Sequence, residues 1–318
     1  MARNDRYKEI QLPQLRSFCV AATAGNFTAA ARTLGLSTPT VWQQVRALEQ
    51  QLHTTLMRRR GRNIELTDDG RLLLELVQPH VSGLDSLETL FAARQHNLPP
   101  ELTAAATPYL ASTYLLKPVR AYTKSHPSIR LKLRVLVWFQ QVVQLVEQGQ
   151  ADAGVIFHDR QEARSPQVDY EYLLDLPFSL LTPVNHPLAR KRTITPADWA
   201  GQPLIVPPEG AYARRTLDRL LQRHDLTGRV RIVMETPLLD SIRQYVAAGL
   251  GIALMHIGQE TFPGVRLHVR PLPDHGDSIG VALLTRRGAH LSEPAEAFRQ
   301  TLREHLGAGP ARWPAKSS

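Results

Sequence analysis

The sequence predicts an α/β protein that carries a small helical domain at its N-terminus. Apolar residues recur every three or four positions over residues 12–52, which is helical spacing. A second helical stretch begins at residue 68 and runs for several turns. From residue 101 short apolar segments alternate with helical ones, as in domains where helices cover a β-sheet. A chain of 318 residues suffices for two or three such domains.

Three helices are predicted in the N-terminal region. Gly25 is suited to end the first, because glycine adopts the left-handed conformation at little cost. Asn26 can cap the second helix, and Ser37 or Thr38 can cap the third. Pro39 then lies in the first turn of the third helix, where a missing N–H costs nothing. The third helix buries its apolar side and leaves polar residues that can hydrogen-bond base edges or phosphates.

An arginine-rich hairpin follows the third helix. Arg58, Arg59, Arg60 and Arg62 surround the turn residue Gly61, and residues 63–67 have strand character. Residues 1–66 contain ten Lys or Arg against four Asp or Glu, so most of the net charge of +9 lies there. An ordinary three-helix domain with a solvated polar face explains the helices but not this hairpin. A basic hairpin after a polar helix is typical of a winged helix-turn-helix that binds DNA, since phosphate contacts supply much of the affinity.

The N-terminal part resembles the LysR-type transcriptional regulators. The resemblance is carried by FTAAARTLGLSTPTVWQQVRALEQQL and then LMRRRGRNIELTDDG, and it continues more weakly to about residue 305. It implies a sequence-specific regulator that binds double-stranded operator DNA and a small-molecule effector, with RNA polymerase as a further partner. Trp42 and Gln43 depart from the family, which usually has a small polar residue at the first position and often a basic one at the second. The candidate DNA-contacting residues are Thr28, Ser37, Thr38, Pro39, Thr40, Gln43, Gln44, Arg46, Arg58, Arg59, Arg60 and Arg62.

A long linker helix is predicted from Asp68, with Thr67 as its cap. Its apolar seam is Leu73, Val77, His80, Leu84, Leu87 and Phe91. A seam this narrow indicates pairing with a second helix, and packing on the chain's own body is the alternative. The resemblance favours a homodimer or homotetramer. Pro79 should kink or interrupt the helix.

The remainder is predicted to be an effector-binding domain with mostly parallel sheets. Strand character is found at 102–107, 131–137, 151–157, 177–184, 203–207, 231–236, 251–255, 265–272 and 279–285. Helices are expected around 109–124, 139–149, 211–224, 238–248 and 292–306. The resemblance implies two subdomains like those of a periplasmic binding protein, with crossings near 159–170 and 264–272. The expected domains are 1–67 for DNA binding, 68–98 as linker, 99–306 for the effector, and a disordered tail at 307–318.

Two strand ends share one local design that suggests an effector site. Thr107-Pro108 and Thr236-Pro237 each join a strand to a helix, where threonine can cap and proline can occupy the first turn. Ligands bind beyond such strand ends, and helix N-termini attract anions. Simple capping is the alternative, because Thr195-Pro196 repeats the dipeptide where no ligand is expected. The candidate effector-binding residues are Thr107, Pro108, Tyr109, Trp138, Phe157, Gly210, Thr236 and Pro237.

These helix ends suggest a small carboxylate or an inorganic oxyanion such as sulfate as the effector. The sequence carries no phosphate loop, dinucleotide-binding glycine motif or nucleophile elbow. No short metal-ligand motif is present among the twelve histidines, and Cys19 fits a small core residue. We therefore expect no enzyme, cofactor or metal. The absence of a long apolar run and of a secretory signal indicates a cytoplasmic protein. The alternatives are a ligand-binding sensor module without operator specificity and an architectural DNA-binding protein without a ligand.

Overall fold

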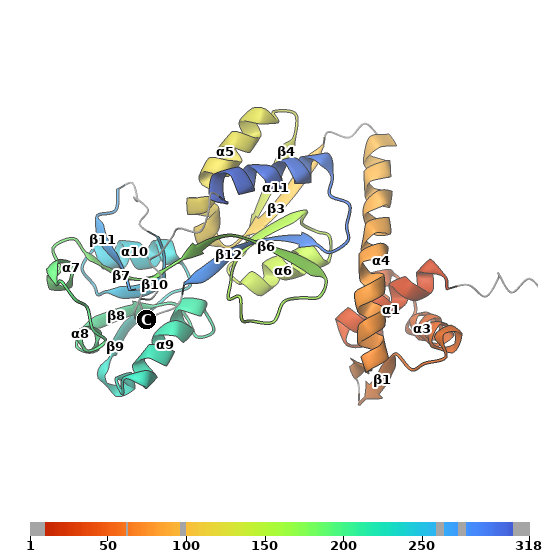
Figure 1. Cartoon of the computed structure of the whole chain (residues 1–318), viewed down its shortest axis with the longest axis horizontal. Helices are drawn as coiled ribbons and strands as arrows, with labels where there is room; N and C mark the ends of the chain where they lie inside the picture. Colours follow the sequence, from red (N-terminus) through yellow and green to blue (C-terminus); the bar gives the residue numbers. More distant parts are fainter. Residues whose placement is uncertain (1–9, 62, 96–99, 259–263, 273–277, 308–318) are drawn as a thin grey trace, which may run out of the picture. The chain divides into compact units, whose positions relative to one another are not determined.

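The computed structural model describes residues 10–61, 63–95, 100–258, 264–272 and 278–307 (Figure 1). The chain divides into two compact units. The first comprises residues 1–98 with the segments 165–169 and 286–292, and the second holds the remainder. Arg62 and all of the predicted tail except Gly307 lie outside the described residues.

The first unit holds the predicted three helices and hairpin. Its elements are α1 (Leu12–Ala24), α2 (Phe27–Leu34), α3 (Thr38–Leu52), β1 (Met57–Arg60), β2 (Asn63–Leu66) and α4 (Asp68–Gln95). Phe18, Val41 and Leu48 are fully buried in one core. The predicted caps are confirmed: Gly25 ends α1 with a φ of 68°, and the Asn26 side chain accepts a hydrogen bond from the Ala29 amide over 2.7 Å. Local sequence therefore determines this part of the fold.

The helix α4 differs from its prediction in two respects. It continues as one helix through Pro79, which we expected to kink or interrupt it. Leu73 and Val77, predicted for the pairing seam, pack instead against the core formed by α1–α3. Because these two residues help to cover the core of the N-terminal domain, the apolar side of α4 that remains exposed is rotated about the helix axis from the predicted seam. That side carries Leu72, Leu76, Leu84, Leu87 and Phe91, which are between 42% and 69% exposed.

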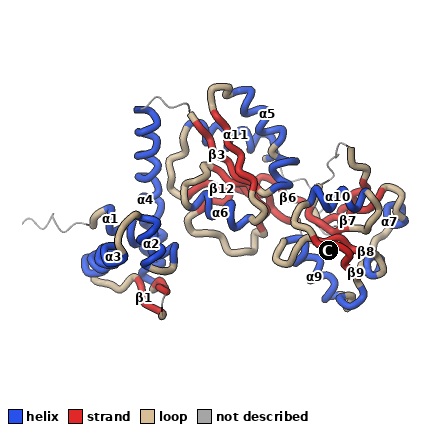
Figure 2. The backbone as a smooth tube through the Cα atoms, turned by 180° about the vertical axis from the view of Figure 1, so that it is seen from behind, coloured by secondary structure: helices blue, strands red, loops and turns tan. Residues whose placement is uncertain are grey.

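The second unit contains two α/β layers, by which we mean two subdomains that each consist of a sheet and its helices (Figures 1 and 2). One sheet has the strand order β4-β3-β5-β12-β6. Its strands are β3 (Glu101–Ala106), β4 (Arg130–Val135), β5 (Ala153–His158), β6 (Val168–Leu176) and β12 (Ile279–Arg286). Both views show α5 (Leu116–Ser125) and α11 (Glu293–Leu306) on one face and α6 (Phe139–Glu147) on the other. A Cβ at Gly154 would lie 3.0 Å from Val142 and Val146, so glycine lets α6 pack closely on β5.

The other layer is built around the sheet β10-β7-β11. A bridge between Leu204 and Ile252 joins it to the pair β8-β9. The strands are β7 (Phe178–Pro183), β8 (Pro203–Val206), β9 (Arg231–Glu235), β10 (Ala253–His256) and β11 (Leu267–Pro271). The helices are α7 (Pro187–Arg190), α8 (Ala197–Ala200), α9 (Tyr212–Arg223) and α10 (Leu239–Ala247), with a 3₁₀ turn at Thr227–Arg229.

Three further predictions about the second unit are corrected. The sheets are mixed: β3 runs parallel to β4 and β5, whereas β12 is antiparallel to β5, and β10 and β11 are antiparallel to β7. The first crossing was predicted near 159–170, but the strand β6 already begins at Val168 and runs to Leu176, so the chain changes layer at Pro177. The return follows β11, later than predicted, because β11 still pairs with β7.

The helix predicted over 109–124 is divided by a π-helical turn at Leu110–Tyr114, which precedes α5. Pro118 lies in the first turn of α5, where its missing amide hydrogen costs nothing. Among the described residues, no helix combines the length and apolar character that spanning a bilayer would need.

Candidate functional site

A groove in the first unit lies between α2, α3 and the β1–β2 hairpin. We call it the wing groove; its volume is about 570 Å³. The predicted DNA-contacting residues that line it are Thr28, Thr38, Pro39, Arg46 and Arg59. Trp42 lines it as well, is 47% exposed, and lies under the Arg46 guanidinium at 5.5 Å from the ring centroid. The groove thus combines two arginines with one large aromatic surface.

Glu49 joins the helix α3 to the hairpin, a role that the sequence analysis missed. It is 6% exposed, and one carboxylate oxygen accepts hydrogen bonds from the amides of Leu56 (2.8 Å) and Met57 (3.1 Å). The other oxygen pairs with Arg46 over 2.8 Å. A buried carboxylate needs such partners. A glutamate facing the apolar side of a predicted helix was the signal that could have revealed it.

The arginines of the β1–β2 hairpin differ from one another in their contacts. Arg58 pairs in register with Glu65, Arg59 with Ile64, and Arg60 with Asn63, so Arg59 faces the groove side with Ile64. The Arg59 side chain donates to the Gly61 carbonyl over 3.1 Å. Arg60 forms an exposed ion pair with Glu65 over 2.8 Å, and this hydrogen bond raises the pKa of Arg60. The Ile64 amide donates to the Gly25 carbonyl over 2.8 Å, which fixes the hairpin to the α1–α2 turn.

The remaining predicted residues of α3 lie outside the groove lining. The Ser37 hydroxyl accepts from the Thr40 amide over 3.2 Å and is 2.7 Å from the Thr40 hydroxyl, so these two residues form the helix cap. Gln44 accepts a hydrogen bond from the Ser17 hydroxyl of α1 and is half-buried. Gln43 is exposed. Gln43 is therefore more accessible to a partner than Gln44.

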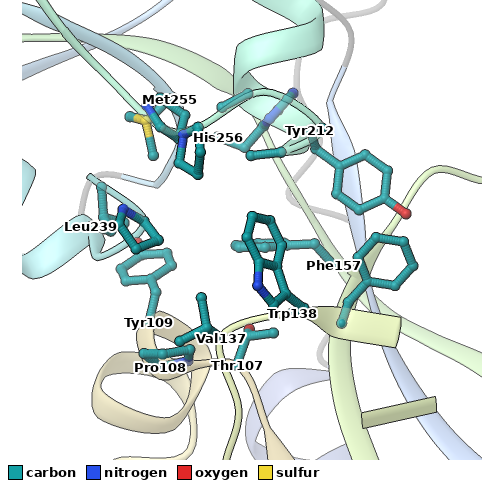
Figure 3. Close-up of a pocket in the computed structure, with 17 residues that line it drawn as sticks. Thr107, Pro108, Tyr109, Val137, Trp138, Phe157, Tyr212, Leu239, Met255 and His256 are labelled. Atoms are coloured by element: carbon teal, nitrogen blue, oxygen red, sulfur yellow. The ribbon is translucent and has the colours of Figure 1, made fainter. Parts of the chain in front are cut away.

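The second unit contains an apolar pocket with a volume of about 130 Å³ (Figure 3). Seven predicted effector-binding residues line it: Thr107, Pro108, Tyr109, Trp138, Phe157, Gly210 and Pro237. They come together because each lies at or just beyond the carboxyl end of a strand, the place where such sheets bind ligands. The structure brings them to one cavity, and their contact with an effector stays a prediction.

The two threonines that suggested this site differ from the expected design. Thr236 is not among the lining residues, and its hydroxyl accepts from the Leu238 amide over 3.5 Å. Thr107 lines the pocket, is 8% exposed, and its hydroxyl oxygen has no hydrogen-bond partner. Neither threonine is the side-chain cap of the helix that follows, because α10 begins only at Leu239 and the Thr107 hydroxyl is unpaired.

Aromatic side chains form much of the pocket wall. Tyr109 stacks on Phe157 with ring centroids 6.1 Å apart, and Phe139 packs against Tyr212 at 5.2 Å. The Tyr212 hydroxyl donates to Glu162, over 2.7 Å, in the segment between β5 and β6, and Arg215 pairs with the same carboxylate. Burial, together with this hydrogen bond, raises the pKa of Tyr212 far above its ordinary value.

Ten further lining residues are outside the predicted set: Val137, Phe139, Pro207, Pro208, Ala211, Tyr212, Ala213, Leu239, Met255 and His256. The strand-end rule could have indicated Met255 and His256, because β10 ends there. The lining residues that the structure describes include no Lys, Arg, Asp or Glu. Within the described ranges, no group of three His, Cys, Asp or Glu side chains is arranged to hold a metal ion.

The comparisons with known proteins agree with both features. Residues 12–71 match the bacterial regulatory helix-turn-helix protein, lysR family, and residues 95–307 match the LysR substrate binding domain. The chain is 28% identical over 299 residues to the RuBisCO operon transcriptional regulator of Allochromatium vinosum, covering 92% of this chain and 95% of that one. It is 30% identical over 298 residues to a probable RuBisCO transcriptional regulator of a Synechocystis strain, covering 90% and 84%.

A solved structure shows the same fold. HinK, a LysR family transcriptional regulator from Pseudomonas aeruginosa, superposes with a TM-score of 0.55 at 21% identity, covering 94% of this chain and 99% of that one. The matched segments include the wing groove and the apolar pocket. This structure confirms the α/β fold with an N-terminal helix-turn-helix, and the two family matches confirm the predicted transcription regulator. The chain belongs to the LysR family of DNA-binding transcription regulators with an effector-binding domain.

Proposed function

We propose that the chain recognises a specific operator through α3 and the wing groove, and that a small effector in the apolar pocket controls this binding. The observation that carries the proposal is the wing groove, where Arg46 and Arg59 flank the exposed edge of α3. Phosphate contacts from such arginines position the protein, and side chains on the helix read base edges. The proposed division remains 1–67 for DNA binding, 68–98 as linker and 99–306 for the effector, in a cytoplasmic protein.

The long helix α4 supports assembly into a homodimer or homotetramer. Its exposed residues Leu72, Leu76, Leu84, Leu87 and Phe91 fall within one side of the helix, and a water-exposed apolar stripe of this length is costly. Pairing two such helices buries the stripe and presents two DNA-binding domains together. The operator is then an interrupted inverted repeat, with RNA polymerase as a further partner of the bound complex.

The effector is proposed to be a small anion, either a carboxylate or an inorganic oxyanion. The supporting observation is that α6, α9 and α10 all begin at the pocket, at Phe139, Tyr212 and Leu239. Helix N-termini carry partial positive charge. To alter DNA binding, the effector must bind one arrangement of the protein more tightly than another.

The test is footprinting on the intergenic DNA beside the gene, at moderate salt with excess competitor DNA. We expect a protected, dyad-symmetric site. Salt-sensitive binding without any protected site, repeated in a genome-wide pull-down, would contradict operator recognition and favour a non-specific anchor. Tight ligand binding by a protein indifferent to DNA would favour the sensor module.

A variant pair locates base recognition on α3. Gln43→Ala should weaken operator binding about tenfold or more while leaving binding to random DNA nearly unchanged, because a bidentate base contact is worth ~1–3 kcal/mol. Gln50→Ala is the matched control, since Gln50 is exposed on the same helix two turns further on. Equal losses on operator and random DNA would assign Gln43 to a phosphate.

A further inference from the structure

We propose that the effector of the apolar pocket is a single-ring aromatic carboxylate, with its ring between the aromatic walls and its carboxylate at Thr107 and the helix ends. This inference rests on the proposed function and names the ligand class of the same site. It combines three properties of the pocket: its size, its apolar wall and the polar groups that remain at its edge.

The size of the pocket suits one ring. Its volume is about 130 Å³. An apolar protein cavity of roughly 150 Å³ is known to admit benzene. A sugar phosphate or nucleotide would not fit without a large opening of the site.

The wall of the pocket suits a flat apolar body. Figure 3 shows Trp138 projecting into the space between Tyr109 and Tyr212, with Leu239 and Met255 across that space. Aromatic pairs gain from offset or edge-on contacts beyond the area that they bury. Trp138 is 40% exposed, so its indole has a free surface on which a ligand ring can pack.

The same wall disfavours an inorganic oxyanion. Sulfate or phosphate would lose its hydration among these side chains, and no Lys or Arg among the described residues lines the pocket to replace that hydration. A ring that carries one carboxylate loses less hydration on entering the pocket, because only one end of the molecule is polar. We therefore retain the carboxylate of the two anion classes and exclude the oxyanion.

Polar groups for one carboxylate are present at the pocket edge. The Thr107 hydroxyl is buried in the lining without a hydrogen-bond partner, which is costly unless a ligand supplies one. The helices α6 and α9 begin after Trp138 and Ala211, both lining residues, and neither helix has a side-chain cap. Their N-terminal amides and the Thr107 hydroxyl are donors, which is what a carboxylate accepts.

Aromatic walls also bind quaternary ammonium ions through cation–π contacts. The positive ends of the helices at this pocket oppose a cation, and none of the lining residues that the structure describes is an Asp or Glu that could attract one. The aromatic wall alone would also accept a cationic ligand. The experiment therefore compares an aromatic carboxylate with an aromatic ammonium ion.

The experiment measures binding of named probes to the full-length protein by calorimetry. The panel is benzoate, salicylate and 4-hydroxybenzoate, compared with sulfate, acetate, benzyl alcohol and benzyltrimethylammonium. We expect at least one aromatic carboxylate to bind tenfold or more tightly than every other probe. Tighter binding of sulfate, acetate, the alcohol or the ammonium ion would overturn the proposal, as would affinities weaker than millimolar for all three aromatic acids.

Thr107→Val should weaken the bound aromatic acid about tenfold or more, since hydrogen bonds to charged groups are the stronger ones. Thr182→Val is the matched control: Thr182 is fully buried and its hydroxyl is likewise unpaired, but it does not line the pocket. An equal loss in both variants would overturn the role of Thr107. Footprinting without ligand distinguishes the failures, because a footprint with no aromatic-acid binding contradicts this inference alone.

Discussion

The wing groove and the apolar pocket differ in the side chains that they offer to a partner. The groove presents Arg46 and Arg59 on the surface, close together along the chain and beside an exposed tryptophan. The described lining of the pocket contains no Lys, Arg, Asp or Glu, and it offers an unpaired hydroxyl and helix ends. The groove is thus suited to a large polyanion that stays hydrated, and the pocket to a small molecule that gives up most of its water.

The difference also concerns how each site is assembled. The groove is built from α2, α3 and one hairpin, which are consecutive in sequence. The pocket takes residues from the ends of β3, β4, β5, β8, β9 and β10, across about 150 residues of chain. One site therefore depends on a few local contacts, and the other depends on the whole second unit.

The largest expected effect is a contrast in salt dependence. Raising NaCl from 50 to 200 mM should weaken operator binding about a thousandfold if six or more phosphates are contacted, whereas binding of the aromatic acid should change less than twofold. Arg59→Ala should reduce the slope of log affinity against log salt by about 0.9, the value for one phosphate contact. Fluorescence anisotropy at several salt concentrations measures both. Arg223→Ala, an exposed arginine of α9, is the control, and an unchanged slope for Arg59→Ala would remove the hairpin from the interface.

A second prediction concerns the buried carboxylate under the groove. Glu49→Leu leaves the amides of Leu56 and Met57 without an acceptor, at about 1–3 kcal/mol for each. Hydrogen-exchange mass spectrometry should then show faster exchange over residues 50–66, and operator affinity should fall. Glu49→Gln retains an acceptor oxygen and should keep most of the protection. Equal protection in the leucine variant and the parent protein would contradict a structural role for Glu49.

The smallest expected effect is a pH dependence in the second unit. Burial lowers the pKa of His158, which is 2% exposed beside the pocket residue Phe157 and 2.8 Å from the Tyr172 hydroxyl. Glu162 and Asp159 oppose this shift, and Arg164 adds to it. As the pH is lowered, His158 is therefore protonated in the unfolded chain before it is protonated in the folded one. The free energy of unfolding contributed by His158 is fully present above pH 6.5 and falls as the pH is lowered below that value.

Thermal unfolding between pH 7.5 and 5 measures this decline. His158→Asn should flatten it, and His224→Asn, a change at an exposed histidine, should not. His268 also has a pKa lowered by burial, so part of the decline should persist in the His158 variant. A decline that is identical with and without the His158 imidazole would exclude it as the source.

The sequence predicted the first unit well because its signals are local. Gly25, Asn26, Ser37 and Pro39 act within one turn of their own position, and each occupies the expected place. Glu49 was missed because its partners lie beyond the end of the helix. The rotation of α4 was missed for the same reason: spacing identifies an apolar stripe but not which side the neighbouring helices cover.

The second unit was predicted in outline. The strand β6 was missed although Val168, Tyr170 and Tyr172 alternate with charged residues, because acidic residues are uncommon in strands. Glu171 makes sense only with Arg299 and Arg303 of α11, more than 120 residues away. In the pocket, the threonine-proline pairs indicated the right strand ends for the wrong reason, since neither threonine provides the expected cap.

Tyr212 gives the pocket a mechanical connection to the rest of the second unit. Its ring forms part of the wall against Phe139, and its hydroxyl holds Glu162 in the segment that leads from β5 into β6. A tyrosine is protonated at physiological pH in any case, and the raised pKa of Tyr212 keeps its hydroxyl hydrogen available for donation in more alkaline solution as well. A bound molecule that displaces the Tyr212 ring would therefore also move Glu162 and the segment between β5 and β6, because the hydrogen bond between them is kept over a wide range of pH.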